Sequence, residues 1–268
     1  MHLAALVAAL VAAGPAAPGP AFRTLEPGLE IALFDGPPGA TGDGKIAAVR
    51  IDPGFFDLQL FNSSAPGQGT PHSARAWADR TGASAVINAS MYQEDHRTAV
   101  SFMRTRGHVN QRRISRDRAA LMFDPLDRTL PSVRFVDRDC EDLDGAAQSY
   151  GTVIQSIRMV SCERKNVWAP SSRRSSVAAV GVDGRGRVLF LHARSAWPVH
   201  DLVEALLTLP IDLRRAMYVE GGPEAQLYAR GGGTELERLG LFESSEAETK
   251  EGWPVPNVIA AVRRKGSR

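Results

Sequence analysis

Residues 176–192, SVAAVGVDGRGRVLFLH, are the stretch that decides the fold. Two apolar runs, 176–182 and 187–192, flank the turn sequence DGRG at 183–186. The Asp-Gly pair supplies residues that tolerate the positive φ angles of a tight hairpin turn. The stretch therefore predicts a β-hairpin of two apolar strands.

Short strands are expected on both sides of this hairpin. Leucine and isoleucine alternate with other residues at 29–33, and Phe and Leu alternate with Asp and Gln at 56–60. Alternation with a period of two is typical of a strand with one buried face. Further strands are expected at 85–88, 100–104, 119–123, 133–136 and 258–263.

Two helices are expected. Thr70 and Pro71 predict an N-cap and a first-turn proline, with Gly82 ending the helix. Pro198 opens the second helix and Pro210 ends it. The side chains expected to face inward are Trp77 and Ala78 in the first helix and Leu202, Leu206 and Leu209 in the second.

Eight or more strands with two modest helices predict an α+β fold, a single domain around a twisted, mainly antiparallel β-sheet. The chain of 268 residues is 43% hydrophobic and 23% charged, which suits a domain with a buried core and excludes disorder. No repeat or linker divides the chain beyond its N-terminus, so one domain is expected over residues 21–268.

The charge balance argues against polyanionic partners. There are 32 basic and 30 acidic residues, a formal net charge of +2, so we expect no nucleic acid partner. Only four of the basic residues are Lys, and the other 28 are Arg. A genome that favours Arg codons is the simplest explanation of this excess. Arg nevertheless offers a planar fork for phosphate or carboxylate, where Lys offers a point charge.

The N-terminus predicts export. Residues 3–13 form an apolar run followed by small residues and prolines up to residue 20. This matches the hydrophobic region of a signal peptide and is too short to span a bilayer. Because no Lys or Arg precedes the run, an Ala-rich start without a signal function is the alternative. We expect residues 1–20 to be a signal peptide and the mature chain to be periplasmic or secreted, without stable membrane insertion.

The expected oxidation state of the two cysteines, Cys140 and Cys162, depends on whether the protein is exported. In an exported protein an even pair most simply forms one disulfide, whereas in the cytosol both would be buried free thiols. Neither the cysteines nor the scattered histidines have metal-ligand spacing, so no metal or cofactor is expected. Asp95 and Asp183 could ligate Ca²⁺, although nothing in their spacing requires it.

Common catalytic motifs are absent from the sequence, among them HExxH, GxSxG, the Walker lysine loop and GxGxxG before a helix. Two segments instead place polar residues at strand ends. AVINASMYQED at 85–95 delivers Asn88 and Asp95 into a loop, where a turn Asn at a strand end is the alternative. MYVEGGPEAQLYAR at 217–230 carries two carboxylates across a Gly-Gly turn, which suits acid and base roles. A plain hairpin turn with solvated glutamates is the alternative there.

Two further segments are rich in Arg. QSIRMV at 155–160 and the pair Arg173 and Arg174 lie at strand entrances, where a guanidinium can clamp phosphate or simply be solvated. Residues 104–118 hold six Arg and no interleaved aromatic residue, which weakens a nucleic-acid interpretation and favours a solvated hairpin tip.

Taken in this order, four stretches resemble the phosphodiester glycosidase family, the bacterial domain related to the uncovering enzyme. They are AVINASMYQED, QSIRMV, RRSSVAAVGVDGRGRVLFL and YVEGGPEAQLY, and the resemblance spans residues 45–263. It implies hydrolysis of a sugar-1-phosphodiester on a phosphorylated glycan or glycoconjugate. The matching site positions are Asn88, Arg174, Glu220, Gly221 and Gly222.

The chain departs from the family pattern at several of these positions. The family's Gly-Gly-Phe-Phe is replaced by residues 89–92, Ala-Ser-Met-Tyr. Its Asp is Glu220, its Ser is Glu224, and Arg158 stands where the family tends to have Pro. An Asp-to-Glu change keeps the carboxylate but moves it by one methylene, which bears on the substrate class.

The expected mechanism divides the work between arginines and carboxylates. Arg174, helped by Arg158, would bind the diester phosphate and stabilise the departing charge. Glu220, with Glu224 or Asp95, would activate water or support an oxocarbenium-like centre. Asn88 and the Gly221-Gly222 backbone would hold sugar hydroxyls or phosphate oxygens. The alternative function is a non-catalytic exported module that binds phosphorylated or acidic glycans, and the sequence leaves the oligomeric state open.

Overall fold

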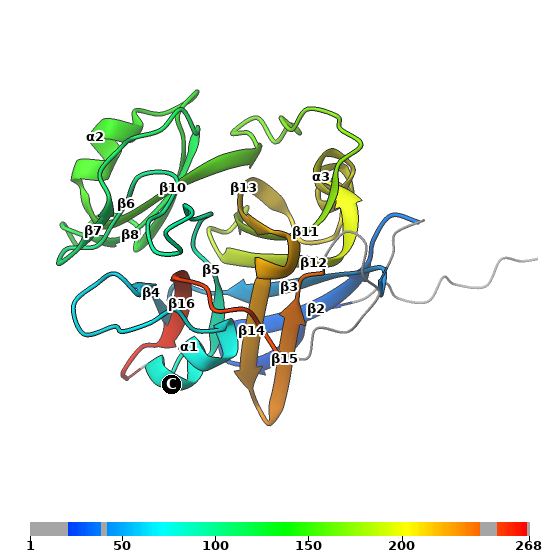
Figure 1. Cartoon of the computed structure of the whole chain (residues 1–268), viewed down its shortest axis with the longest axis horizontal. Coiled ribbons are helices and arrows are strands. Elements are labelled where there is room, and N and C mark those ends of the chain that lie inside the picture. Colours follow the sequence, from blue (N-terminus) through cyan, green and yellow to red (C-terminus); the bar gives the residue numbers. More distant parts are fainter. Residues whose placement is uncertain (1–20, 39–41, 242–250, 267–268) are drawn as a thin grey trace, which may run out of the picture.

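The computed structural model describes residues 21–38, 42–241 and 251–266. The predicted signal peptide, residues 1–20, lies outside the described residues. The described part has an α+β fold, as expected, and every strand pairing in it is antiparallel. The strands form two sheets rather than the one sheet expected (Figure 1).

The larger sheet has eleven strands. Along it the order is β1-β2-β3-β12-β11-β13-β10-β6-β7, with β8 paired to β10 and β9 paired to β8. Its strands are β1 (Arg23–Glu26), β2 (Leu29–Asp35), β3 (Lys45–Ile51), β6 (Met103–Arg104), β7 (Val109–Gln111), β8 (Ala119–Pro125), β9 (Val133–Asp137), β10 (Tyr150–Val160), β11 (Arg174–Asp183), β12 (Val188–Pro198) and β13 (Leu213–Gly221).

The smaller sheet has five strands in the order β15-β14-β5-β16-β4. Its strands are β4 (Phe56–Asn62), β5 (Ala85–Asn88), β14 (Gln226–Gly231), β15 (Thr234–Leu239) and β16 (Asn257–Arg263). A single 3₁₀ turn, η1 (Gly222–Glu224), joins the last residue of β13 in the large sheet to β14 in the small one. The Gly221-Gly222 segment therefore connects the large sheet to the small one.

The main core fills the space between the two sheets. Leu29 and Val49 of the large sheet lie in one buried cluster with Ile87 and Leu227 of the small sheet. The opposite face of the large sheet packs against α3 (Val199–Thr208). Because both faces of the central strands are covered, β10, β11 and β12 are buried almost throughout rather than alternating between buried and exposed residues.

The predicted hairpin is confirmed as β11 and β12, with Val182 paired to Val188. The positive φ angle falls at Gly186, at 77°, rather than at the Asp-Gly pair. Asp183 explains why. Its carboxylate accepts hydrogen bonds from the backbone N–H groups of Arg185 and Arg187, both at 2.9 Å, and these bonds shape the turn.

Both expected helices are present, and a third was missed. The first, α1 (Ala74–Thr81), ends at Gly82 as predicted, but its N-cap is Ser73 rather than Thr70. His72 forms a bridge with Val255, which keeps the chain extended up to that point. The missed helix is α2 (Leu143–Gln148), a six-residue helix capped by the Asp142 side chain. Its sequence, LDGAAQ, is too short to show a helical period.

The strand prediction at 100–104 is too long, since only Met103 and Arg104 form β6. β6 and β7 form the hairpin expected in the Arg-rich segment. In the described part of the chain no helix is long and apolar enough to cross a membrane.

Candidate active site

A pocket of about 480 Å³ lies where β13 ends and the chain turns toward the small sheet. Val199, the first residue of α3, and residues 171 and 173–175 around the start of β11 contribute to its lining. Its lining combines two carboxylates, two guanidinium groups, two aromatic rings and the glycine turn. These residues are Glu220, Glu224, Arg173, Arg174, Trp168, Tyr218, Gly221 and Gly222, with Met91, Ile157, Ser171, Ser175, Val199, Pro223 and Leu241.

Strand geometry brings the acid and one aromatic ring together. Tyr218 and Glu220 are two residues apart in β13, so their side chains leave the same face of the sheet. Met217, which precedes Tyr218, and Val219, which lies between the two, belong to the core between the sheets. At the end of β13 the side chains of Tyr218 and Glu220 therefore line the pocket, and the alternate residues lie in the core.

The glycine turn places the second carboxylate. Gly222 has a φ of 65°, a left-handed conformation that glycine adopts without strain. Pro223 then opens the 3₁₀ turn and Glu224 closes it, partly exposed on the pocket wall. The segment at Gly240 passes close to the turn. A Cβ atom at residue 240 would lie 1.8 Å from the Gly222 carbonyl oxygen, which explains why this residue is also glycine.

Buried polar side chains hold this turn from behind. Asn88, at the end of β5, accepts a hydrogen bond from the Gln226 N–H at 2.8 Å and donates to the Glu224 carbonyl at 3.0 Å. His192 Nε2 lies 3.0 Å from the Ala225 carbonyl oxygen and donates to it, which fixes the proton on Nε2. Burial lowers the pKa of His192 to about 3, so the ring is neutral. Both side chains position the turn.

Glu220 is the most perturbed carboxyl group of the pocket. Its side chain is buried, with 9% of the residue exposed, and its Oε1 accepts one hydrogen bond, from the Gly221 N–H at 3.0 Å. Burial raises its pKa to about 8, and the charge of Glu224 adds to the rise against the opposing effect of the Gly221 bond. At neutral pH Glu220 therefore carries a proton that it can donate.

The other side of the pocket is cationic. Arg173 directly precedes β11 and Arg174 is its first residue, and both are exposed and line the pocket. The backbone of Arg173 is tied to the Ser171 side chain by a hydrogen bond of 3.1 Å. Two adjacent arginines share the pocket with a buried and a partly buried carboxyl group, and guanidinium groups suit an anionic ligand such as phosphate.

An aromatic pair forms the remaining wall. The rings of Trp168 and Tyr218 lie 5.3 Å apart, tilted by 37°. Trp168 is held through its backbone, because its N–H donates to Asn166 at 3.0 Å and its carbonyl accepts from His200 Nδ1 at 2.6 Å. Asn166 also donates to Glu204 of α3 at 2.7 Å, so α3 fixes the loop that carries Trp168.

The structure brings together most of the predicted site residues. Glu220, Glu224, Arg174, Gly221 and Gly222 all line the pocket. Three others lie elsewhere.

Asn88 is buried behind the turn. Asp95 is exposed and accepts hydrogen bonds from the N–H groups of Arg97 and Thr98 in its own loop, at 3.0 and 2.9 Å. Those bonds, with one from the Thr98 hydroxyl, lower its pKa.

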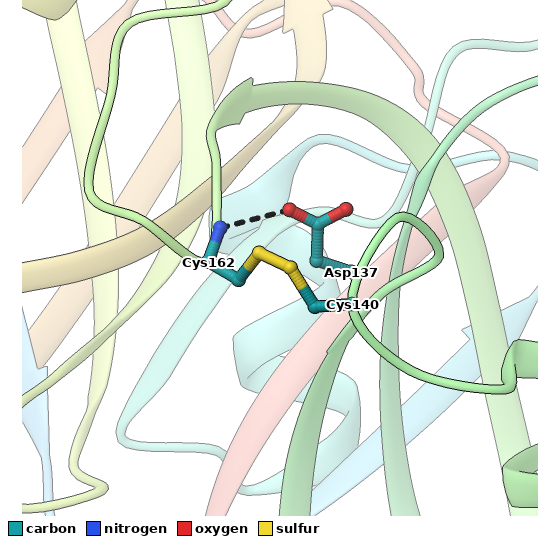
Figure 2. A group of neighbouring side chains, drawn as sticks. All are labelled: Asp137, Cys140 and Cys162. Carbon is teal, nitrogen blue, oxygen red and sulfur yellow. Dashed lines mark hydrogen bonds between the residues drawn. A yellow bond between two sulfur atoms is a disulfide. The ribbon is translucent and has the colours of Figure 1, made fainter.

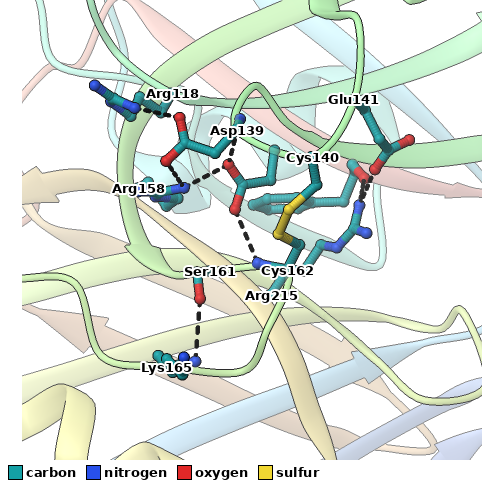
Figure 3. A network of polar contacts seen from close by, with 11 residues as sticks. Arg118, Asp139, Cys140, Glu141, Arg158, Ser161, Cys162, Lys165 and Arg215 are labelled. Atoms are coloured by element: carbon teal, nitrogen blue, oxygen red, sulfur yellow. Dashed lines mark hydrogen bonds and ion pairs between the residues drawn. A yellow bond between two sulfur atoms is a disulfide. The ribbon is translucent and has the colours of Figure 1, made fainter.

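Arg158 is the third residue outside the pocket lining. Its Nη1 contacts Asp137 at 2.6 Å and Asp139 at 2.8 Å (Figure 3). The neighbouring ion pair of Arg215 with Glu141 belongs to the same surface of β9, β10 and β13. Arg158 is thus neutralised by two carboxylates in a structural network. The arginine that lines the pocket together with Arg174 is Arg173, and the sequence alone could not distinguish it from Arg158.

Cys140 and Cys162 form a disulfide, with their Cα atoms 6.6 Å apart. Together with Asp137 they are a group of potential metal ligands within 4.8 Å of one another (Figure 2). The group does not fit a metal, because disulfide sulfurs are not thiolates and Asp137 already accepts from Arg158 and from the Cys162 N–H at 2.8 Å. The disulfide instead fastens the start of the Trp168 loop to the end of β9.

Trp168 and Tyr218 were not singled out from the sequence. Tyr218 carried a usable signal, since a residue two positions before Glu220 in a regular strand shares its face. Both side chains line the pocket although the pairing with β11 shifts by one residue between them. Trp168 carried none, because it lies in a loop whose path depends on the disulfide and on α3.

The family model for phosphodiester glycosidases matches residues 81–262. The chain belongs to the phosphodiester glycosidase family. The resemblance carried by the four sequence motifs is therefore confirmed, and with it the assignment to hydrolases that act as glycosidases on phosphodiesters. Glycosidase chemistry implies a carbohydrate substrate.

Solved structures share this fold at low sequence identity. The catalytic domain of zebrafish N-acetylglucosamine-1-phosphodiester alpha-N-acetylglucosaminidase, auto-inhibited by its pro-peptide, is 12% identical with a TM-score of 0.60. The alignment covers 94% of this chain and 86% of that one. A hypothetical protein from Synechocystis is also 12% identical, with a TM-score of 0.58, covering 93% of this chain and 64% of that one. No curated protein matches the chain significantly.

Proposed function

We propose that this phosphodiester glycosidase hydrolyses a sugar-1-phosphodiester, breaking the bond between the anomeric carbon and the phosphate oxygen. One observation carries the proposal. A protonated carboxyl group, Glu220, and a second carboxyl group, Glu224, share one pocket with the guanidinium groups of Arg173 and Arg174. A sugar phosphodiester needs both kinds of group, since it has an anionic phosphate and an acid-labile glycosidic bond.

The two arginines bind the phosphate. As the C1–O bond breaks, the bonding electrons pass to the phosphate oxygen, and the leaving group gains negative charge. Arg173 and Arg174 offset this charge, because preorganised cations stabilise charge where it develops in the transition state. In this scheme Glu220 donates a hydrogen bond or its proton to the departing phosphate, as a carboxyl group with a raised pKa does in general acid catalysis.

Glu224 acts on the sugar side. Its side chain is partly exposed and lines the pocket. From there the carboxyl group can assist the attacking water or stabilise positive charge at the anomeric carbon. The aromatic wall of Trp168 and Tyr218 offers an apolar surface for the face of a sugar ring. The Asn88 and His192 contacts keep this turn fixed while charge moves across it.

The test is a panel of sugar-1-phosphodiesters with an activated aglycone, followed by analysis of both products. We expect release of the free sugar and of the phosphomonoester, and loss of turnover in Glu220→Gln and in Arg174→Ala. Unchanged turnover in both variants would refute the assignment. Binding of an intact diester with no product after long incubation would refute hydrolysis and favour a glycan-binding module.

Export is proposed on two supports. The Cys140–Cys162 disulfide is typical of oxidising compartments, and the apolar run at 3–13 resembles a signal peptide. On this proposal residues 1–20 are removed and the domain begins near residue 21. Mass analysis of the mature chain purified from the producing cell, without reductant, tests both features together.

A further inference from the structure

The hydroxyl of Tyr218 occupies an unusual place beside the glycine turn. A Cβ atom built on Gly221 would lie 1.8 Å from the Tyr218 hydroxyl oxygen and 3.0 Å from its Cζ. The hydroxyl therefore lies directly over the Gly221 backbone, next to the carboxyl group of Glu220. Any other residue at position 221 would displace it.

The backbone at Gly221 gives no other reason for glycine. Its φ is −141° and its ψ is 171°, an extended conformation that every residue adopts. Apart from Tyr218, the nearest atom to the added Cβ is the Ser176 carbonyl oxygen, at 3.3 Å. The absence of a side chain at residue 221 thus serves the position of the Tyr218 hydroxyl, whereas Gly222 is glycine for its positive φ.

The surroundings of the hydroxyl are those of a ligand-binding group. It makes a hydrogen bond with the Ser175 side chain, and the charges of Arg173, Glu220 and Glu224 all act on it. A phenol hydroxyl both donates and accepts hydrogen bonds, so the bond with Ser175 leaves capacity for a ligand in the pocket. The ring itself is fixed by Trp168 on one side and by the core under α3 on the other.

We propose that the Tyr218 hydroxyl donates a hydrogen bond to the phosphate group of the substrate, and that Gly221 lacks a side chain so that this hydroxyl can lie beside Glu220. The inference rests on the proposed function and adds a third type of phosphate contact to Arg173 and Arg174. The hydroxyl keeps its proton throughout, so no bond is made or broken at Tyr218. Burial and the neighbouring carboxylates raise its pKa above the usual value, which keeps it a donor at every working pH.

The first experiment compares Tyr218→Phe with a matched control. Tyr150→Phe also removes one hydroxyl, which donates to the Pro131 carbonyl at 3.0 Å outside the pocket lining. Affinity for inorganic phosphate is measured by calorimetry, and kcat/KM is measured on the sugar phosphodiester. Loss of a hydrogen bond to a charged group weakens phosphate binding by about 10- to 100-fold in Tyr218→Phe. Tyr150→Phe binds phosphate as the native protein does.

The second experiment is a double-mutant cycle that tests the role of Gly221. We expect Gly221→Ala alone to weaken phosphate binding as much as Tyr218→Phe does, because the methyl group pushes the hydroxyl away. In the Tyr218→Phe background the same change has a much smaller effect, since the overlapping oxygen is gone and the contacts that remain are 3.0 Å to Cζ and 3.3 Å to the Ser176 carbonyl oxygen. Circular dichroism and melting of each variant verify that it is folded.

The outcomes separate this inference from the proposed function. Tyr218-dependent phosphate binding without turnover of any sugar phosphodiester would refute the function and keep the inference. Turnover by the native protein with unchanged phosphate affinity and kcat/KM in Tyr218→Phe would refute the inference alone. Additive effects of the Gly221 and Tyr218 changes would overturn the steric explanation of Gly221.

Discussion

Two buried acids, Asp137 and Glu220, differ in how their burial is compensated, and the difference matches the structural role of Asp137 and the catalytic role proposed for Glu220. Asp137 is fully buried at the end of β9. Its Oδ1 accepts from Arg158 Nη1 at 2.6 Å and from the Asp139 N–H at 3.1 Å, and its Oδ2 accepts from the Cys162 N–H at 2.8 Å (Figures 2 and 3). A guanidinium and two backbone donors compensate for its burial.

Glu220 is buried with far less compensation. Within the described residues its carboxyl group accepts one backbone hydrogen bond and forms no ion pair, and Glu224 adds a like charge nearby. Its pKa therefore rises to about 8, and it lies on a pocket wall rather than inside a network. A buried carboxyl group with few partners, at the edge of a pocket, is costly for stability and is the kind of group that catalysis uses.

The largest expected effect is the loss of activity in Glu220→Gln. The amide keeps the size of the side chain but cannot donate a proton to the leaving phosphate, so kcat falls by about 10²- to 10⁴-fold. Steady-state kinetics on the sugar phosphodiester measure this, with intact phosphate binding as evidence of a folded pocket. A fall of less than threefold would mean that Glu220 is not the proton donor.

In contrast to Glu220→Gln, Asp137→Asn should reduce the stability of the protein rather than its activity. The change leaves Arg158 with Asp139 alone and sets an amide against the Cys162 N–H, which lowers the free energy of unfolding by about 3 kcal/mol. Urea denaturation measures the loss. Because Asp137 lies outside the pocket lining, kcat/KM of the folded variant stays within about threefold of native. Lost activity at native stability would contradict a structural role.

Glu220→Gln should also stabilise the protein at alkaline pH. The folded-state pKa of Glu220 is raised from 4.5 to about 8, so between those values the folded state holds a proton that the unfolded state has lost. Native stability therefore falls as pH rises from 4.5 to 8, and the variant escapes this loss. At pH 9 its melting temperature should exceed the native value by roughly 10 °C, with no gain at pH 4.

A matched exposed acid provides the control for that measurement. Glu163 pairs with Lys165 at 2.5 Å, and this pair lowers the pKa of Glu163. Glu163→Gln therefore gains nothing at pH 9. If both variants gained equally, a change in net charge rather than the burial of Glu220 would be the cause.

The sequence was sufficient to predict the fold class, most strand positions and two of the carboxylates that line the pocket, Glu220 and Glu224, but Asp95 lies outside it. The pattern that made Glu220 a candidate was local, an apolar strand followed by a Gly-Gly turn, and strand periodicity is a local property. The existence of two sheets was not predictable in this way. It depends on η1, which carries the chain from β13 in one sheet to β14 in the other. The sequence of residues 222–224 does not show which sheet the next strand joins.

The arginines show the limit most clearly. Arg158, Arg173 and Arg174 were all expected at strand entrances and received the same interpretation. Arg158 instead lies near the end of β10, whereas Arg173 and Arg174 lie at the start of β11. What separates them is which carboxylates the fold brings nearby, and for Arg158 these come from β9 and the turn after it. Ion-pair partners 19 and 21 residues away are set by sheet register rather than by any local pattern.

The smallest expected effect is a shift of the pH profile in Glu224→Gln, and it tests why Glu220 differs from Asp137. The native rate should fall as pH rises through about 8, because Glu220 loses the proton that it donates. Burial is the main cause of the raised pKa and the charge of Glu224 a lesser one, so removing that charge moves this alkaline limb down by about half a pH unit. The pH dependence of kcat/KM in the two proteins measures the shift. An upward shift would have the wrong sign for a like charge, and a limb that returned to the value of an exposed carboxyl would make the charge, rather than burial, the main cause.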